Sequence, residues 1–152
     1  MFGPALCLRP LRANLPPMEF GSQVAERILD QVADAVIYAN RSGEIILWNR
    51  ASAALFGYPA KEALGQSLDL IIPEHLRASH WRGFDAAIAS GHTKLEGRPT
   101  LTRAVHKSGR RIYVEMTFAI VTGDKDEVIG SVAVARDVTE RIEKERSANR
   151  AS

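Results

Sequence analysis

One histidine of this 152-residue chain occupies a position where an imidazole could bind an iron centre. Residues 73–90 have the pattern of a helix, in which Leu76, His80, Phe84 and Ile88 recur every fourth residue and share one face. His80 therefore projects from an apolar stripe. A neutral imidazole in an apolar pocket is an axial ligand of haem iron, although a core histidine with a satisfied ring produces the same pattern.

A methionine is a second candidate ligand. Between residues 111 and 121, Ile112, Val114, Met116 and Phe118 alternate with more polar residues, which predicts a strand with one buried face. Met116 thus lies in the middle of a strand, on its buried side and next to Phe118. Its thioether is either a core-packing group or a soft ligand for iron.

Positive charge is concentrated between Arg77 and Arg111, where eight lysine and arginine residues accompany only two acidic ones, while the net charge of the chain is +2. This stretch is either a solvated basic surface or a site for an anionic group, such as a phosphate, a carboxylate or the acid arms of a cofactor. No recognition-helix motif accompanies it, so we do not expect direct nucleic-acid binding.

The remaining composition argues against several classes of protein. Cys7 is the only cysteine, which excludes an internal disulfide and a Cys/His zinc cluster and predicts a reducing, cytoplasmic location. No apolar run approaches the ~18–20 residues of a membrane helix. The sequence shows no nucleophile–base pair, carboxylate pair or glycine-rich phosphate loop, so we expect no enzymatic activity.

The elements that must position these side chains follow from periodicity and turn residues. The order of elements predicts an α+β domain, with a five-stranded antiparallel sheet, short helices over one face, and flanking N- and C-terminal helices. We expect a flexible arm over residues 1–20, the domain over 21–138 and an exit helix over 139–152. The predicted strands are 35–39, 44–49, 95–105, 111–121 and 128–136. The predicted helices before the exit helix are 22–32, 50–56, 60–64 and 73–90. Ser22 is expected to cap the first helix, and Asp137 and Glu140 to form a capping box before the exit helix.

Four segments resemble the PAS domain, a sensor module of signalling proteins: residues 28–35 (ILDQVADA), 48–58 (WNRASAALFGY), 106–111 (HKSGRR) and 136–141 (RDVTER). The resemblance implies the same fold, a sensory role, and an exit helix that carries the signal to a downstream effector domain or partner protein. It also implies a homodimer paired through the terminal helices, which suits the apolar stripe of Val24, Ile28 and Val32. Asn49 is expected to cap the helix that follows it.

Residues 72–80 (IPEHLRASH) are similar to the haem-PAS domains of rhizobial oxygen-sensor kinases, in which an arginine precedes the proximal histidine by three residues, as Arg77 precedes His80. The segment from His92 to Arg98 resembles a stretch in which a histidine contacts a haem propionate and an arginine meets bound oxygen. A register without gaps places Lys94 at the histidine position instead.

This second resemblance implies haem b as cofactor and a diatomic gas (O₂, CO or NO) as ligand, with His80 and, in a six-coordinate state, Met116 on the iron. Flavin is not expected, because residues 68–90 lack the cysteine of the light-sensing members. The alternative is a cofactor-free PAS module that acts by dimerisation and protein–protein interaction. His75 and His106 are expected at the surface. The candidate cofactor-binding residues are His80, Phe84, His92, Lys94, Leu95, Arg98, Met116 and Phe118.

Overall fold

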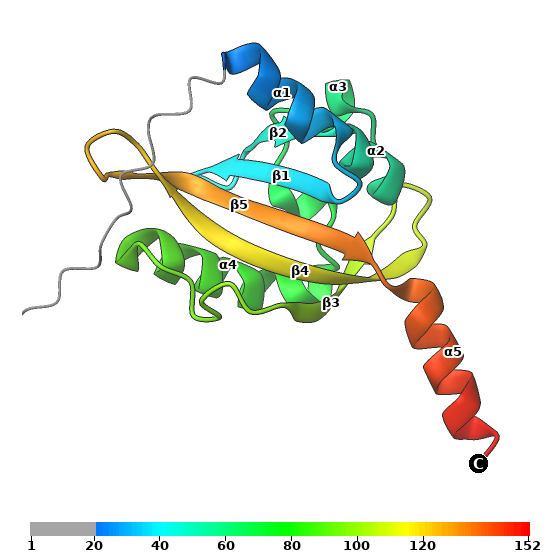
Figure 1. Cartoon of the computed structure of the whole chain (residues 1–152). Coiled ribbons are helices and arrows are strands. Elements are labelled where there is room, and N and C mark those ends of the chain that lie inside the picture. Colours follow the sequence, from blue (N-terminus) through cyan, green and yellow to red (C-terminus); the bar gives the residue numbers. More distant parts are fainter. Residues whose placement is uncertain (1–20) are drawn as a thin grey trace, which may run out of the picture.

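The computed structural model describes residues 21–152, and its centre is a five-stranded antiparallel sheet (Figure 1). Because β1 pairs with β5, the two halves of the chain share one sheet in the order β2-β1-β5-β4-β3. This confirms the predicted α+β class and the five-stranded sheet. The strands are β1 (Ala35–Asn40), β2 (Ile45–Trp48), β3 (Thr100–Val105), β4 (Arg111–Thr122) and β5 (Val128–Asp137).

One face of the sheet forms the core, and we call it the inner face. The alternation of β4 places Ile112, Val114 and Met116 on this face, where all three are buried. Three short elements and the longer helix α4 cover the inner face, and each of them contributes a buried apolar side chain. They are α2 (Arg50–Phe56) with Phe56, α3 (Ala60–Ala63) with Ala63, the 3-10 turn η1 (Leu68–Leu70) with Leu68, and α4 (Glu74–Ser90) with Phe84.

Two further helices flank the domain. The first helix, α1 (Ser22–Gln31), lies near β1 and α2 and has no buried residue, whereas α5 (Thr139–Arg150) extends away from the sheet and buries Ile142 (Figure 1). Within residues 21–152, no helix has the length and apolar character to cross a membrane. The arm predicted for residues 1–20 lies outside the described residues.

Asn49 caps α2 as predicted, and its amide also joins three elements. Its Oδ1 accepts hydrogen bonds from the backbone N–H groups of Ser52 and Val36, both at 2.9 Å. Its Nδ2 donates to the carbonyl oxygens of Leu29 at 2.7 Å and Asp34 at 3.1 Å. Since the buried amide is fully hydrogen-bonded, it holds α1, β1 and α2 together at little desolvation cost.

The structure differs from the sequence prediction at the start of β3. This strand begins at Thr100 and not at residue 95, because residues 94–97 form a turn. Within it, Glu96 has a φ of 49° and Gly97 a φ of 78°. A strand cannot hold two successive left-handed residues, so the polar segment 91–99 becomes a loop.

Two helix caps also differ from the prediction. Ser22 is the first helical residue of α1 and makes no capping hydrogen bond, because Gly21 occupies the cap position. Before α5, the Asp137 carboxylate accepts from the N–H of Thr139 at 2.9 Å, so it does stabilise the start of the helix. Glu140, however, pairs with Lys144 one turn further on, and the reciprocal half of the capping box is not formed.

Candidate functional site

His80 lies on α4 between aromatic neighbours. The edge of Trp81 meets its ring with centroids 4.9 Å apart, and the Phe84 ring lies 6.0 Å away. The Nδ1 atom of His80 is fully buried and has no hydrogen-bond partner, the one such side-chain atom among the described residues. Burial lowers the pKa of His80, while the carboxylates of Asp69 and Asp85 oppose this shift. The imidazole is therefore neutral at pH 7 and carries an unused nitrogen lone pair or N–H group.

The orientation of this part of α4 is fixed by Trp81, which the sequence analysis does not identify. The indole Nε1 donates to the Asp69 carboxylate at 2.9 Å, which joins α4 to η1. The far edge of the ring lies against Gly43 in the β1–β2 turn, where a Cβ atom would overlap it. Trp81, the neighbour of His80 in sequence, thus connects α4 with η1 and with the β1–β2 turn. In the sequence, only the turn glycine Gly43 hints at a close contact, and sequence alone does not show which side chain packs on it.

Arg77, three residues before His80, binds the backbone of the preceding loop. Its guanidinium donates to the carbonyl oxygens of Ile72 at 3.1 Å and Asp69 at 3.2 Å, and its Nε lies 3.8 Å from the Asp69 carboxylate. Arg77 therefore stabilises the start of α4 by binding the backbone of the loop before it.

Three other candidates lie in the core beneath α4. Phe84 and Met116 belong to the same buried cluster, and Phe118 packs against that cluster from the inner face of β4. In β4, Met116 pairs with Thr100 of β3 on one side and with Ala135 of β5 on the other. Phe84, Met116 and Phe118 thus lie in the layer between α4 and the sheet, and half-buried His80 meets this layer through its contact with Phe84.

The remaining candidates lie on the loop that joins α4 to β3. His92, Lys94 and Arg98 are exposed, and Leu95 is half-buried. The His92 Nδ1 lies 3.0 Å from the carbonyl oxygen of Ser90, and the Arg98 Nε donates to the carbonyl oxygen of Leu95 at 3.1 Å. In this conformation the three polar side chains are in solvent and are not gathered around His80.

The other two histidines are His75, on the surface of α4, and His106, at the β3–β4 turn. His75 is exposed, as predicted. His106 is half-buried, because its ring lies against Gly57 and its Nδ1 accepts from the N–H of Ser108 at 3.0 Å. The ring of His106 thus closes the β3–β4 turn predicted for it against the end of α2, and it is half-buried there.

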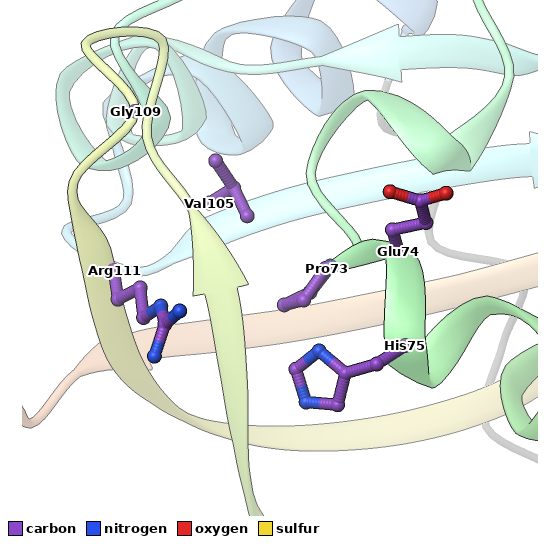
Figure 2. Close-up of a pocket in the computed structure, with 6 residues that line it drawn as sticks. All are labelled: Pro73, Glu74, His75, Val105, Gly109 and Arg111. Carbon is purple, nitrogen blue, oxygen red and sulfur yellow. The ribbon is translucent and has the colours of Figure 1, made fainter.

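A crevice of about 550 Å³ lies at the start of α4 and is separate from His80. Figure 2 shows His75 on α4 and Arg111 on β4 on either side of the end of β3, both turned toward that strand, whereas Glu74 is turned away from them. Neither His75 nor Arg111 makes a side-chain hydrogen bond or ion pair with any residue between 21 and 152. Pro73, Val105 and Gly109 complete the lining.

The sequence pattern of the PAS fold matches residues 25–138, which is more than half of the chain. The chain belongs to the PAS family. This PAS domain is 30% identical over 131 residues to an uncharacterized protein of Azorhizobium caulinodans, a match that covers 85% of this chain and 18% of that protein. It is 26% identical over 120 residues to the oxygen sensor protein DosP of Escherichia coli, covering 78% and 15% of the two chains. The chain thus spans less than a fifth of the length of these two relatives.

Solved structures agree with the family assignment. A PAS domain from Colwellia psychrerythraea superposes with a TM-score of 0.68 at 23% identity, covering 78% of this chain and 98% of that one. An RNA-binding Light-Oxygen-Voltage receptor superposes with a TM-score of 0.70 at 22% identity, covering 95% of this chain and 40% of that one. At this level of identity the likeness shows the fold of the PAS domain.

The junction at the end of this PAS domain is held by contacts between α5 and β4. The N–H of Val138 donates to the carbonyl oxygen of Tyr113 at 2.9 Å, and the N–H of Tyr113 donates to the Thr139 hydroxyl at 3.0 Å. Further along α5, Arg146 donates to the Tyr113 hydroxyl at 2.6 Å. The direction of α5 is therefore coupled to the strand that carries Met116.

Proposed function

We propose that this sensory PAS domain binds haem b through His80 and responds to a diatomic gas (O₂, CO or NO). The supporting observation is the unpartnered, buried Nδ1 of a neutral histidine on α4, whose ring lies 6.0 Å from that of the core residue Phe84. A core histidine kept for packing alone would leave this desolvated polar atom uncompensated, which costs about 1–3 kcal/mol. A histidine that orders a cofactor recovers that cost when the cofactor binds. The similarity to an oxygen sensor protein of Escherichia coli supports the same assignment.

The residues beneath α4 fit such a group. His80 would supply an imidazole ligand, while Phe84, Met116 and Phe118 would supply apolar surface. When bound, haem iron supplies reversible coordination of a diatomic gas. These side chains would hold the cofactor, exclude water from it and select the gas.

The propionate groups of haem are anionic and favour cationic partners, and the loop between α4 and β3 carries such side chains. His92 and Lys94 are exposed, so either could turn toward a propionate, for which His92 would give up its contact with the Ser90 carbonyl oxygen. Arg98 is the candidate that steadies a polar ligand such as O₂, and for this role it must exchange its bond to the Leu95 carbonyl for the ligand.

The experiment that tests the assignment compares His80→Ala with His75→Ala, an exposed histidine on the same helix. We expect the unaltered chain, supplemented with haem, to show a Soret band at about 400–430 nm. His80→Ala should lose stable haem binding and retain its circular dichroism spectrum, and His75→Ala should match the unaltered chain. No Soret band in the unaltered chain, under either reducing or oxidising conditions, would refute the proposal.

Met116 decides which gas is favoured. If its thioether is the sixth ligand, Met116→Leu should change the reduced spectrum from six-coordinate to five-coordinate and accelerate CO binding. This substitution conserves volume and should cost less than about 1.5 kcal/mol of stability, so a spectral change would report coordination. An unchanged reduced spectrum assigns Met116 to core packing, and O₂ steadied by Arg98 becomes the favoured signal.

A second candidate function is a cofactor-free PAS module that acts by dimerisation and partner binding. The observation that favours it is the stripe of Val24, Ile28 and Val32 on α1, which are 43%, 50% and 38% exposed. Under either function, output passes through α5 to an effector domain or partner protein. Light-Oxygen-Voltage receptors among the structural neighbours raise flavin as another ligand, but that likeness concerns the fold, and no cysteine lies in the segment that would face a flavin ring.

A further inference from the structure

The two edges of the sheet differ in how their backbone groups are satisfied. At the β2 edge, Ile45 donates to the carbonyl oxygen of Gln66 at 2.8 Å and accepts from the N–H of Gly65 at 2.9 Å, so a neighbouring loop covers it. At the β3 edge, the corresponding contact is one hydrogen bond from the N–H of Val105 to the carbonyl oxygen of Ile71, at 2.9 Å. An edge strand with unpaired groups is a template for another strand.

The hydrogen bonds at the end of β3 show which of its groups point outward. The N–H of Val105 points away from β4, because it reaches Ile71, and the N–H of His106 points toward β4, because it reaches Arg110. Backbone groups of alternate residues point to opposite sides of a strand. The N–H and C=O groups of Leu101 and Arg103 therefore point outward with Val105. No described residue hydrogen-bonds to these four groups.

This open edge leads into the crevice of Figure 2, because Val105 belongs to both. Two arginines lie along the way, and Glu115, opposite Leu101 in β4, is paired with Arg141 at 3.3 Å. Arg103 follows Leu101 on the outer face of the sheet, and Arg111 and His75 face the crevice without an acidic partner. The one acidic group in the lining, Glu74, is turned away from them in Figure 2.

We propose that the β3 edge binds an extended acidic segment of a partner protein, which adds a sixth strand at Leu101 and Arg103 and places a carboxylate between Arg111 and His75. This mode supplies backbone hydrogen bonds for affinity and a charge pocket for selectivity. A second copy of this chain is a poorer occupant. In a two-fold antiparallel pair centred on Arg103, that residue would face its own copy, and like charges directly opposite are unfavourable.

The test uses the full chain and two capped, fluorescein-labelled hexapeptides, one of alternating valine and glutamate and one of alternating valine and lysine. We expect the acidic peptide to raise fluorescence anisotropy at low salt, and to shift the ¹⁵N–¹H signals of Leu101, Arg103 and Arg111 in nuclear magnetic resonance spectra. Signals that shift elsewhere, or equal binding of the lysine peptide, would overturn the proposal. Concentration-dependent shifts at Leu101 without any peptide would assign the edge to self-pairing and overturn it as well.

Two matched pairs of variants test the geometry. Leu101→Pro removes an outward N–H and leaves the β3–β4 hydrogen bonds in place, which edge strands tolerate. It should weaken peptide binding by about two- to tenfold relative to Leu101→Ala. Arg111→Gln should weaken binding more than Arg110→Gln, its neighbour outside the crevice lining, and the difference should vanish at high salt. Equal affinities within each pair would refute the proposal.

A third measurement covers the case in which Leu101→Pro fails to fold. N-methylation of alternate residues in the acidic peptide removes the hydrogen-bond donors from one edge of the peptide and leaves the protein unaltered. Methylation on one alternating set should abolish binding and methylation on the other should not, because an added strand uses one of its two edges. If both methylated peptides bind like the parent, no strand is added.

Discussion

Replacement of Asn49 by alanine would leave four backbone groups without their hydrogen-bond partner: the N–H groups of Val36 and Ser52 and the carbonyls of Leu29 and Asp34. We expect Asn49→Ala to lower the free energy of unfolding by about 3 kcal/mol, measured by urea denaturation. Asn149→Ala, an exposed control in α5, should change it by less than about 0.5 kcal/mol. Similar effects for the two variants would show that the Asn49 amide contributes little.

His80 gives the cofactor-free chain a pH-dependent stability. Its pKa is lowered by burial in the folded state, against the opposing carboxylates of Asp69 and Asp85, while the unfolded chain has the ordinary value near 6.5. The unfolded state therefore takes up the proton first, and stability falls as the pH drops through 6.5 toward the folded pKa. We expect His80→Leu to lose less stability than the unaltered chain between pH 7.5 and 5.5. His92→Leu, at an exposed site, should behave like the unaltered chain, and identical pH profiles for all three would contradict the shift.

At the residue scale, sequence predicts which side chains share a face of a helix or strand, but not which contacts and hydrogen bonds each side chain makes. The four-residue period places His80 and Phe84 on one face of α4, where Phe84 is buried and His80 is half-buried with a buried Nδ1. The position of Trp81 depends on Gly43 and Asp69, which are distant in sequence, and no periodicity reveals that contact. His92 and Arg98 belong to a loop whose path follows from two left-handed residues, so their resemblance to a haem-contacting segment does not fix their positions.

At the scale of elements, the contact between α4 and the β1–β2 turn can be tested with two glycines of the same backbone conformation. Gly43 has a φ of 78° and lies against Trp81, whereas Gly109 has a φ of 84° and no heavy atom where its Cβ would stand. Both alanine variants incur the cost of a left-handed residue, about 1 kcal/mol. Gly43→Ala should cost about 2 kcal/mol more in urea denaturation, because it also overlaps the indole.

The background variant Trp81→Ala supplies the control. In that background the difference between Gly43→Ala and Gly109→Ala should shrink, since the ring that causes the overlap is absent. An undiminished difference would place the cost in the turn itself and not in the contact with α4.

The helices and strands predicted from periodicity are found in the structure, with the largest difference at the start of β3. Apolar and β-branched residues before Thr100 are few, and Leu95 alone suggests a strand there. The turn at Glu96 and Gly97 is stabilised by local backbone hydrogen bonds, such as the one from Arg98 N–H to the Leu95 carbonyl at 2.9 Å. Local bonds of this kind compete with pairing to β4, and a pattern of residue types does not show which of them wins.

At the scale of the whole molecule, the domain leaves one helix without a buried side. Sheet, α2 and α4 share the core, but the contact of α1 with the domain includes a single side-chain bond to its backbone, from Asn49 to Leu29. An amphipathic helix with an uncovered apolar stripe gains stability when another surface covers it.

Ile28, at the centre of the α1 stripe and 50% exposed, is the residue with which to test this arrangement. We expect the chain to sediment as a dimer and Ile28→Glu to weaken the dimer by more than about tenfold, because a carboxylate would be buried without a partner. Gln23→Glu adds the same charge on the polar side of α1 and should leave the dimer intact. If Ile28→Glu sediments like the unaltered chain over a range of concentrations, α1 does not form the dimer contact. The exposed Val134 on the outer face of the sheet then becomes the next surface to substitute.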